Sequence, residues 1–185
     1  TLLFSVAGYI YSEDLEYARN QSRFENLASA IEHDLQSTLT AYGQILRGGV
    51  AFLNAKPDAS REEWHTFIEN LELEKSYPSI QGISYTKILR GPSTAQQFEA
   101  RIRRTDRPDF TIKPEGDRDL YASVLYVEPL TPANEWVIGF DIYSEANRRE
   151  TVDRALATGE PNLTAKITLV QESLLKEGST TQAGV

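Results

Sequence analysis

The sequence predicts an α+β protein in which a long N-terminal stalk helix precedes a mostly antiparallel sheet with flanking helices. Three observations lead to this fold class. Apolar residues recur every three or four positions along the N-terminal part of the chain, as on one face of a helix. Beyond Pro57, a stretch that alternates apolar and polar residues is typical of a half-buried strand. Helix start and stop signals then recur between the predicted strands.

The stalk helix is predicted from an unbroken helical pattern. Residues 13–54 contain no Pro and no loop-like polar cluster, and their apolar side chains share one face: Phe24, Leu27, Ile31, Leu35, Leu39, Tyr42, Leu46, Val50 and Leu53. Such a helix would reach about 60 Å, too long for an internal element of a small domain. Its lower half needs a partner helix, although the spacing is not a strict heptad. We therefore expect a homodimer through a stalk at residues 13–56.

The first residues of the chain have a membrane-like character. Residues 1–12 carry no charge, and acidic residues follow at once within 13–16. This stretch is too short to span a membrane, which takes about 20 apolar residues. Tyr9 and Tyr11 resemble an interfacial aromatic belt, and the acidic flank suits the non-cytoplasmic side. We expect the outer end of a transmembrane helix, with the remainder periplasmic or extracellular at the inner (plasma) membrane; the alternative is an ordinary amphipathic helix.

Residues 57–185 are expected to form the body, with three helices at 60–75, 93–104 and 144–158. Ser60 and Glu63 have the spacing of a capping box at the first helix. Ser93 and Gln96 have the same spacing at the second. Gly159 stands at the usual position after the end of the third.

Five short stretches are predicted as strands, at residues 80–89, 110–113, 122–128, 136–140 and 163–170. The second and third are expected to form a hairpin with a generous loop around Pro114–Gly116. The chain stops in the turn-like stretch 180–185. We therefore expect the strand that closes the sheet to be truncated, lying beyond Val185.

Composition and motifs argue against an enzyme. The net charge of −8 excludes a nucleic-acid partner, because phosphates require a basic surface. The chain has no cysteine, and so no thiol nucleophile or thiolate metal site. His33 and His65, the only histidines, belong to no metal-binding or catalytic spacing. In the basic stretch 87–107, Arg101 and Arg104 could bind an anion. We favour a solvated helix face or ion pairs to the acidic loop at 115–119. We expect no catalytic residue, metal or cofactor.

Four segments, in this order along residues 77–170, resemble the CHASE domain family of extracytoplasmic sensors. They are Tyr-Pro-Ser-Ile-Gln-Gly-Ile-Ser-Tyr at 77–85, Tyr-Ala-Ser-Val-Leu-Tyr-Val-Glu-Pro at 121–129, Gly-Phe-Asp at 139–141 with Arg148 and Arg149, and Ala-Leu-Ala-Thr-Gly at 155–159 with Leu163 and Thr164. The helix predicted at 13–54 matches the stalk of the family. The resemblance implies a PAS-like ligand-binding fold.

The resemblance also implies ligand-binding residues. Plant members bind cytokinins, which are adenine derivatives, through an aspartate that matches Asp141 and a backbone contact that matches Leu163. From the residues alone, Asp141 either contacts a ligand or supports the start of the helix near Ser144. Tyr126 and Trp136 either line the same cavity or fill the core.

The expected function is that of a ligand-sensing domain in a transmembrane receptor, either a bacterial histidine kinase or a diguanylate cyclase. A small molecule, for which an adenine-like compound is one candidate, would bias paired stalk helices between two arrangements. The alternative is a ligand-free dimerisation or protein-interaction domain of a membrane receptor.

Overall fold

The computed structural model describes residues 2–167, with side chains from Arg19 onward and that of Tyr17. The chain divides into two compact units, a single helix and a body, between Asn54 and Ala55. The α+β class with its long N-terminal helix and antiparallel sheet is confirmed. Among the described residues, no helix has the combination of length and apolar character that a membrane crossing requires. The membrane role of residues 1–12 stays a prediction.

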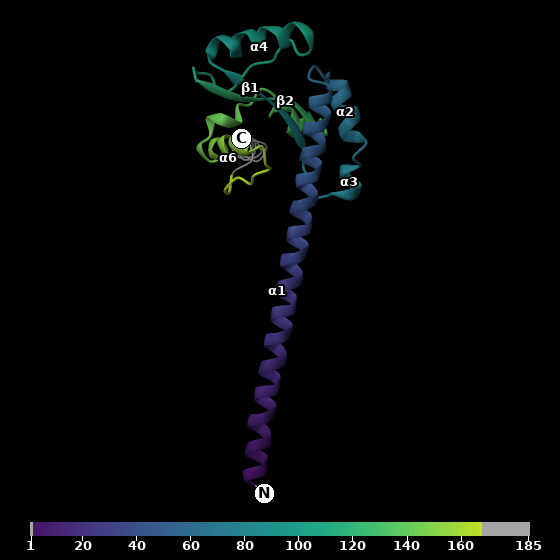
Figure 1. The fold of residues 1–185 in the computed structure, drawn as a ribbon, viewed down its shortest axis with the longest axis vertical. Coiled ribbons are helices and arrows are strands. Elements are labelled where there is room, and N and C mark those ends of the chain that lie inside the picture. Colours follow the sequence, from purple (N-terminus) through teal and green to yellow (C-terminus); the bar gives the residue numbers. More distant parts are fainter. Residues whose placement is uncertain (1, 168–185) are drawn as a thin grey trace, which may run out of the picture. The chain divides into compact units, whose positions relative to one another are not determined.

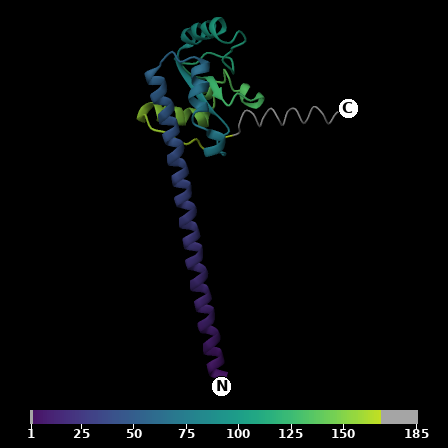
Figure 2. The ribbon, with the colours of Figure 1, turned by 90° about the vertical axis from the view of Figure 1, so that its right-hand side faces the viewer.

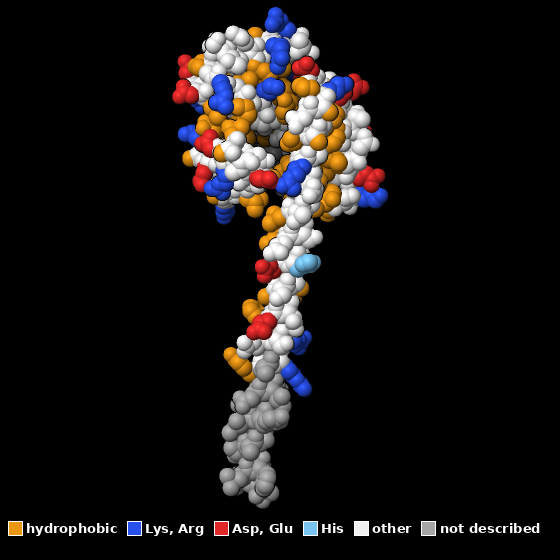
Figure 3. All heavy atoms as spheres, viewed as in Figure 1, with side chains coloured by type: hydrophobic (Ala, Val, Ile, Leu, Met, Phe, Trp, Pro, Cys, Tyr) orange, Lys and Arg blue, Asp and Glu red, His pale blue; other side chains and the backbone are white. Residues whose placement is uncertain are grey.

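Helix α1 (Leu2–Ala55) is continuous, as the absence of Pro and the helical period predict (Figure 1). At 1.5 Å per residue it is about 80 Å long. Phe24, Leu27, Ile31 and Leu35 are each more than half exposed. Apolar side chains stand out in orange along this helix in Figure 3. Within the described residues, the 24–35 part of α1 therefore carries an apolar stripe that is exposed to solvent.

The predicted helix at 60–75 is divided in two. Helix α2 (Arg61–Glu69) begins with the expected capping box, since Ser60 Oγ accepts a hydrogen bond from the Glu63 amide and the Glu63 carboxylate accepts one from the Ser60 amide. A left-handed Glu72, with φ 46°, precedes α3 (Leu73–Ser76). In one continuous helix Leu73 would lie opposite the buried Trp64. The break lets both side chains be buried.

Strand β1 (Ile83–Arg90) pairs antiparallel with β2 (Leu120–Glu128), from Ile83 opposite Glu128 to Arg90 opposite Leu120. A bulge interrupts the register after Tyr85. Both strands are confirmed near their predicted positions. Every residue of β2 from 121 to 128 is buried, so β2 is the centre of the core. Figures 1 and 2 show α4 above the two strands and α6 below them.

The predicted strands at 110–113 and 136–140 are wrong. Helix α5 (Pro132–Glu135) ends just before the second stretch, and successive turns occupy that stretch instead of a strand. Only isolated bridges remain, from Lys113 to Phe140 and from Ser123 to Asp141. Gly139 lies between β2 and the 110–113 segment with φ +82°, and a Cβ there would lie 2.1 Å from the Thr111 carbonyl oxygen. This close crossing bends the backbone away from a regular strand.

Helix α4 (Pro92–Thr105) begins earlier than predicted. Its N-cap is Gly91, which makes no side-chain cap, and Pro92 occupies the first turn. Proline is favoured at that position because its fixed φ suits a helix and it lacks only an amide that would have no partner there. Ser93 therefore lies inside the helix, and its predicted capping role is wrong.

The last helical region is close to the prediction. A short 3₁₀ helix, η1 (Ile142–Ser144), precedes α6 (Ala146–Thr158). Gly159 ends α6 in the left-handed conformation, with φ 71°, as its position predicts. The strand predicted at 163–170 is absent from 163–167, and 168–170 lie outside the described residues.

Candidate functional site

The Asp141 carboxylate is fully buried at the junction of β2 and η1. Its Oδ1 accepts hydrogen bonds from the amides of Ala122 at 2.8 Å and Tyr143 at 3.0 Å. Its Oδ2 lies 3.5 Å from Arg118 Nε and makes no hydrogen bond within the described residues. The bond to Tyr143 caps η1, as the helix-supporting role of Asp141 requires. The other carboxylate oxygen, Oδ2, is left as an unused acceptor within the described residues.

Tyr126 lies in the buried aromatic core between α2 and the sheet. Its ring centroid is 6.0 Å from that of Tyr85, and its hydroxyl donates to the Ala59 carbonyl at 3.3 Å. The Arg61 guanidinium lies over the ring at 5.4 Å. Burial raises the pKa of Tyr126 above its usual value, and the Asp106 carboxylate adds to the rise. Tyr126 also borders a cavity of about 300 Å³ beside Arg61.

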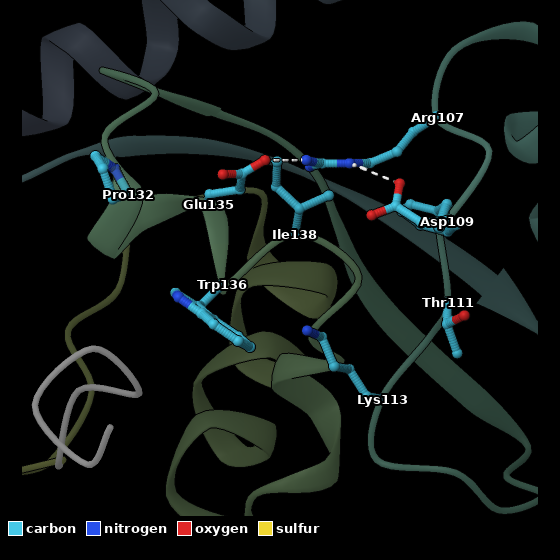
Figure 4. A pocket seen from close by; sticks show the side chains of 9 residues that line it. Arg107, Asp109, Thr111, Lys113, Pro132, Glu135, Trp136 and Ile138 are labelled. Carbon is cyan, nitrogen blue, oxygen red and sulfur yellow. Dashed lines mark hydrogen bonds and ion pairs between the residues drawn. The ribbon is translucent and has the colours of Figure 1, made fainter. Parts of the chain in front are cut away.

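Trp136 borders a different cavity, of about 330 Å³ (Figure 4). We call this the Trp136 cavity; its walls include Arg107, Phe110, Lys113, Glu135, Trp136 and Ile138. Trp136 ends α5 and is 58% exposed, whereas Phe110 and Ile138 are buried. The cavity therefore has an apolar floor and an open aromatic wall.

The charged groups of the Trp136 cavity fall into two sets. Arg107 Nη2 bonds the Glu135 carboxylate, and Arg107 Nε donates to Asp109 Oδ1 at 3.2 Å. The Lys113 ammonium lies 5.8 Å from the centre of the Trp136 ring. Within the part of the chain that the structure describes, Lys113 makes no ion pair.

None of the cavities of about 300, 330 and 400 Å³ within the described part of the chain is lined by all four predicted ligand residues. Leu163 is 70% exposed, and its carbonyl oxygen accepts a hydrogen bond from Thr151 Oγ1 at 3.5 Å. Tyr126 and Trp136 line separate cavities, and neither Asp141 nor Leu163 lines either of them. Their joint role as a ligand site stays a prediction.

A third cavity, of about 400 Å³, lies beside His65 and Glu128. His65 Nδ1 is 3.0 Å from Glu128 Oε2, and the buried Glu128 carboxylate raises the pKa of His65 through this hydrogen bond and through its charge. Among the described residues, no group of three or more His, Cys, Asp or Glu side chains could hold a metal ion.

A comparison with models of protein families shows the family to which the chain belongs. The model of the CHASE domain family matches residues 57–184, more than half of the chain. The chain belongs to the CHASE domain family. CHASE domains are extracytoplasmic sensory domains of signalling receptors and are not catalytic. The resemblance found in the sequence is thereby confirmed. No curated protein matches the chain.

In this CHASE domain, the residues of the Trp136 cavity other than Trp136 itself were missed by sequence reasoning. The sequence predicts a solvated basic stretch around Arg107 and a strand at Lys113. The bridge between Lys113 and Phe140 is what brings 107–113 beside 132–138. The sequence predicted strands at 110–113 and 136–140, close to this contact, but it did not predict that these two segments pair with each other.

Proposed function

We propose that this CHASE domain senses a small molecule outside the inner (plasma) membrane for a transmembrane receptor, a histidine kinase or diguanylate cyclase. The Trp136 cavity is the observation that carries the proposal. Its volume of about 330 Å³ falls within the range of small-molecule sites, which is roughly 300–1,000 Å³. It combines an apolar floor with a few charged groups, as such sites commonly do.

The exposed indole favours ligand binding at this place. A ligand that covers Trp136 and the buried floor of Phe110 and Ile138 would remove apolar surface from water. Aromatic side chains offer a large contact area for a planar or apolar group. The favourable free energy of burying the Trp136 indole is obtained only when a bound molecule or another part of the protein covers it.

The framework around the cavity supports a pre-formed site. Thr131 caps α5, and the buried Asn134 donates to the carbonyl oxygens of Gln81 at 3.1 Å and Pro129 at 2.9 Å. The Lys113 amide donates to the Gly139 carbonyl at 2.9 Å. A site whose walls are fixed in this way loses less conformational entropy when a ligand binds.

The same backbone bonds offer a path from the cavity into the sheet. The Asp141 amide donates to the Lys113 carbonyl at 2.7 Å, and the Asp141 side chain holds Ala122 of β2. A ligand that moves Lys113 would therefore act on β2. In the proposed receptor, two α1 helices pair through their exposed apolar stripe, and the ligand shifts the balance between two arrangements of the pair.

The structure supports a framework role for Tyr126 and Asp141 more directly than a ligand contact by Asp141 or Leu163. Tyr126 and Asp141 are buried by contacts within the domain, so their first role in the proposal is to hold the framework. A contact of Asp141 with an adenine-like ligand stays a prediction from the family resemblance. For this reason adenine derivatives belong in the ligand screen.

Thermal melts with a library of small metabolites test the proposal. We expect at least one compound to raise the melting temperature, because a ligand at 100 times its Kd stabilises the folded state by about 2.7 kcal/mol. The Trp136→Ala variant should fold, since Trp136 is largely exposed, and should lose the shift. A library without any effect would favour the alternative, a ligand-free dimerisation or interaction domain. A shift that Trp136→Ala retains would move the site elsewhere.

A further inference from the structure

The Arg107 end of the Trp136 cavity carries surplus negative charge. One guanidinium faces two carboxylates, those of Glu135 and Asp109. Each carboxylate uses one oxygen toward Arg107, as the dashed lines in Figure 4 show. Within the described residues, the second oxygen of each carboxylate accepts no hydrogen bond and stays available as an acceptor. This end can therefore take a cationic group.

The Lys113 end has the opposite character. The ammonium lies against the Trp136 ring, an interaction that contributes about 0.5–1 kcal/mol at exposed sites. It has no carboxylate partner within the described chain, and in the view of Figure 4 it lies across Ile138 from the Arg107 ion pairs. A compact ammonium with three donors can bind an anionic group. This end can therefore take a carboxylate.

Apolar groups line the same cavity as the two charged ends. Trp136, Phe110 and Ile138 contribute an aromatic wall and a buried floor. The four charged side chains of the cavity sum to zero, since Arg107 and Lys113 balance Asp109 and Glu135. A ligand with a single charge would match one end and leave the other without a partner. A neutral zwitterion with an apolar group would match both ends and the floor.

We infer that the Trp136 cavity selects a zwitterionic small molecule, an α-amino acid with an aromatic or large aliphatic side chain. Its carboxylate binds the Lys113 ammonium, its ammonium binds the free oxygens of Glu135 and Asp109, and its side chain covers Trp136. This assignment rests on the proposed function and names the ligand class of that site.

Three matched probes test the charge requirement by calorimetric titration of the chain. L-phenylalanine carries both groups, 3-phenylpropionate lacks the ammonium, and 2-phenylethylamine lacks the carboxylate. We expect L-phenylalanine to bind at least tenfold more tightly than either single-charge probe. Equal or tighter binding of either single-charge probe would overturn the inference.

Two variants separate the ends of the site. Lys113→Gln should weaken L-phenylalanine and 3-phenylpropionate by about tenfold, which corresponds to about 1.4 kcal/mol, and leave 2-phenylethylamine unaffected. Glu135→Gln should weaken L-phenylalanine and 2-phenylethylamine and spare 3-phenylpropionate. Lys75→Gln, at an exposed lysine of α3, is the matched control and should change none of them. Uniform weakening of all three probes by both variants would indicate a structural effect and overturn the assignment.

The outcomes distinguish the inference from the proposed function. If no amino acid binds but another metabolite shifts the melt in a Trp136-dependent way, the zwitterion inference fails and the sensing function stands. If neither amino acids nor any metabolite bind, both fail.

Discussion

At the scale of single residues, Asp141 holds together segments that are far apart in the sequence. Its Oδ1 bonds the amide of Ala122 on β2 and the amide of Tyr143 in η1. Its second oxygen lies 3.5 Å from Arg118. The carboxylate therefore ties β2 to η1, because it is the hydrogen-bond acceptor for both amides.

Removal of this carboxylate should destabilise the domain. We expect Asp141→Ala to lower the free energy of unfolding by about 3–5 kcal/mol, since it leaves buried groups without partners. Asp141→Asn keeps one acceptor oxygen and should lose less. Urea denaturation measures both against Asp117→Ala, an exposed control. If Asp141→Ala is as stable as the parent chain, the hydrogen bonds of Asp141 do not hold these segments together.

Asp141 also shows why single residues were hard to assign from the sequence. An acidic residue after an apolar run is compatible with both a helix cap and a ligand contact, because in each role a carboxylate oxygen accepts a hydrogen bond. Burial decides such cases, and burial depends on partners such as Ala122 and Arg118 that lie 19 and 23 positions away in the sequence. For Trp136 the sequence left a cavity wall and core filling open, and the indole, 58% exposed, does not fill the core.

At the scale of elements, α2 is connected to the end of β2 by His65 and Glu128. The His65 Nδ1 atom lies 3.0 Å from the buried Glu128 carboxylate and Nε2 lies 4.0 Å from Glu69. Glu128 first, and then Glu69 and Glu62, raise the pKa of His65 above its usual value of 6.5. The charged groups that face this ring are acidic, so each favours the imidazolium.

This contact should make the stability of the domain depend on pH. Because folding raises the pKa of His65, its stabilising contribution is fully present below the unfolded value of about 6.5 and is lost as pH rises through the folded value. We expect the difference in unfolding free energy between the parent chain and His65→Gln to shrink as pH rises above 6.5. Urea denaturation from pH 5.5 to 8.5 measures this difference.

The partners of His65 provide the control. Glu128→Gln should remove most of this pH dependence, and Glu69→Gln, which removes the more distant and exposed carboxylate, should remove less. A difference that stays constant across the pH range would show that His65 has no electrostatic link to β2.

Elements with local signals were predicted well. The period of apolar residues defines α1, the Ser60 capping box defines the start of α2, and Gly159 defines the end of α6. Elements that depend on distant contacts were not. Gly139 bends because it passes the Thr111 carbonyl, and no pattern within 136–140 reports that contact.

At the scale of the whole molecule, the chain joins a sensory body to one long helix. The CHASE family match covers the body, over residues 57–184. The exposed apolar stripe of α1 is the basis for proposing a dimeric stalk. The sequence identified the family and the long N-terminal helix because both lie in ordered local patterns. It identified one residue of the candidate ligand site, Trp136, since the others come together only through the fold.

Disulfide crosslinking of α1 tests the central claim, that the sensor acts through paired stalk helices. The chain has no cysteine, so a single substitution reports one position. Leu27→Cys and Ile31→Cys lie on the exposed stripe, and Ser29→Cys, between them in the sequence, lies on the opposite face. We predict rapid crosslinked dimers at Leu27→Cys and Ile31→Cys, slow ones at Ser29→Cys, and a changed ratio when a ligand from the melts is added. Equal rates at all three positions, or no response to ligand, would contradict it.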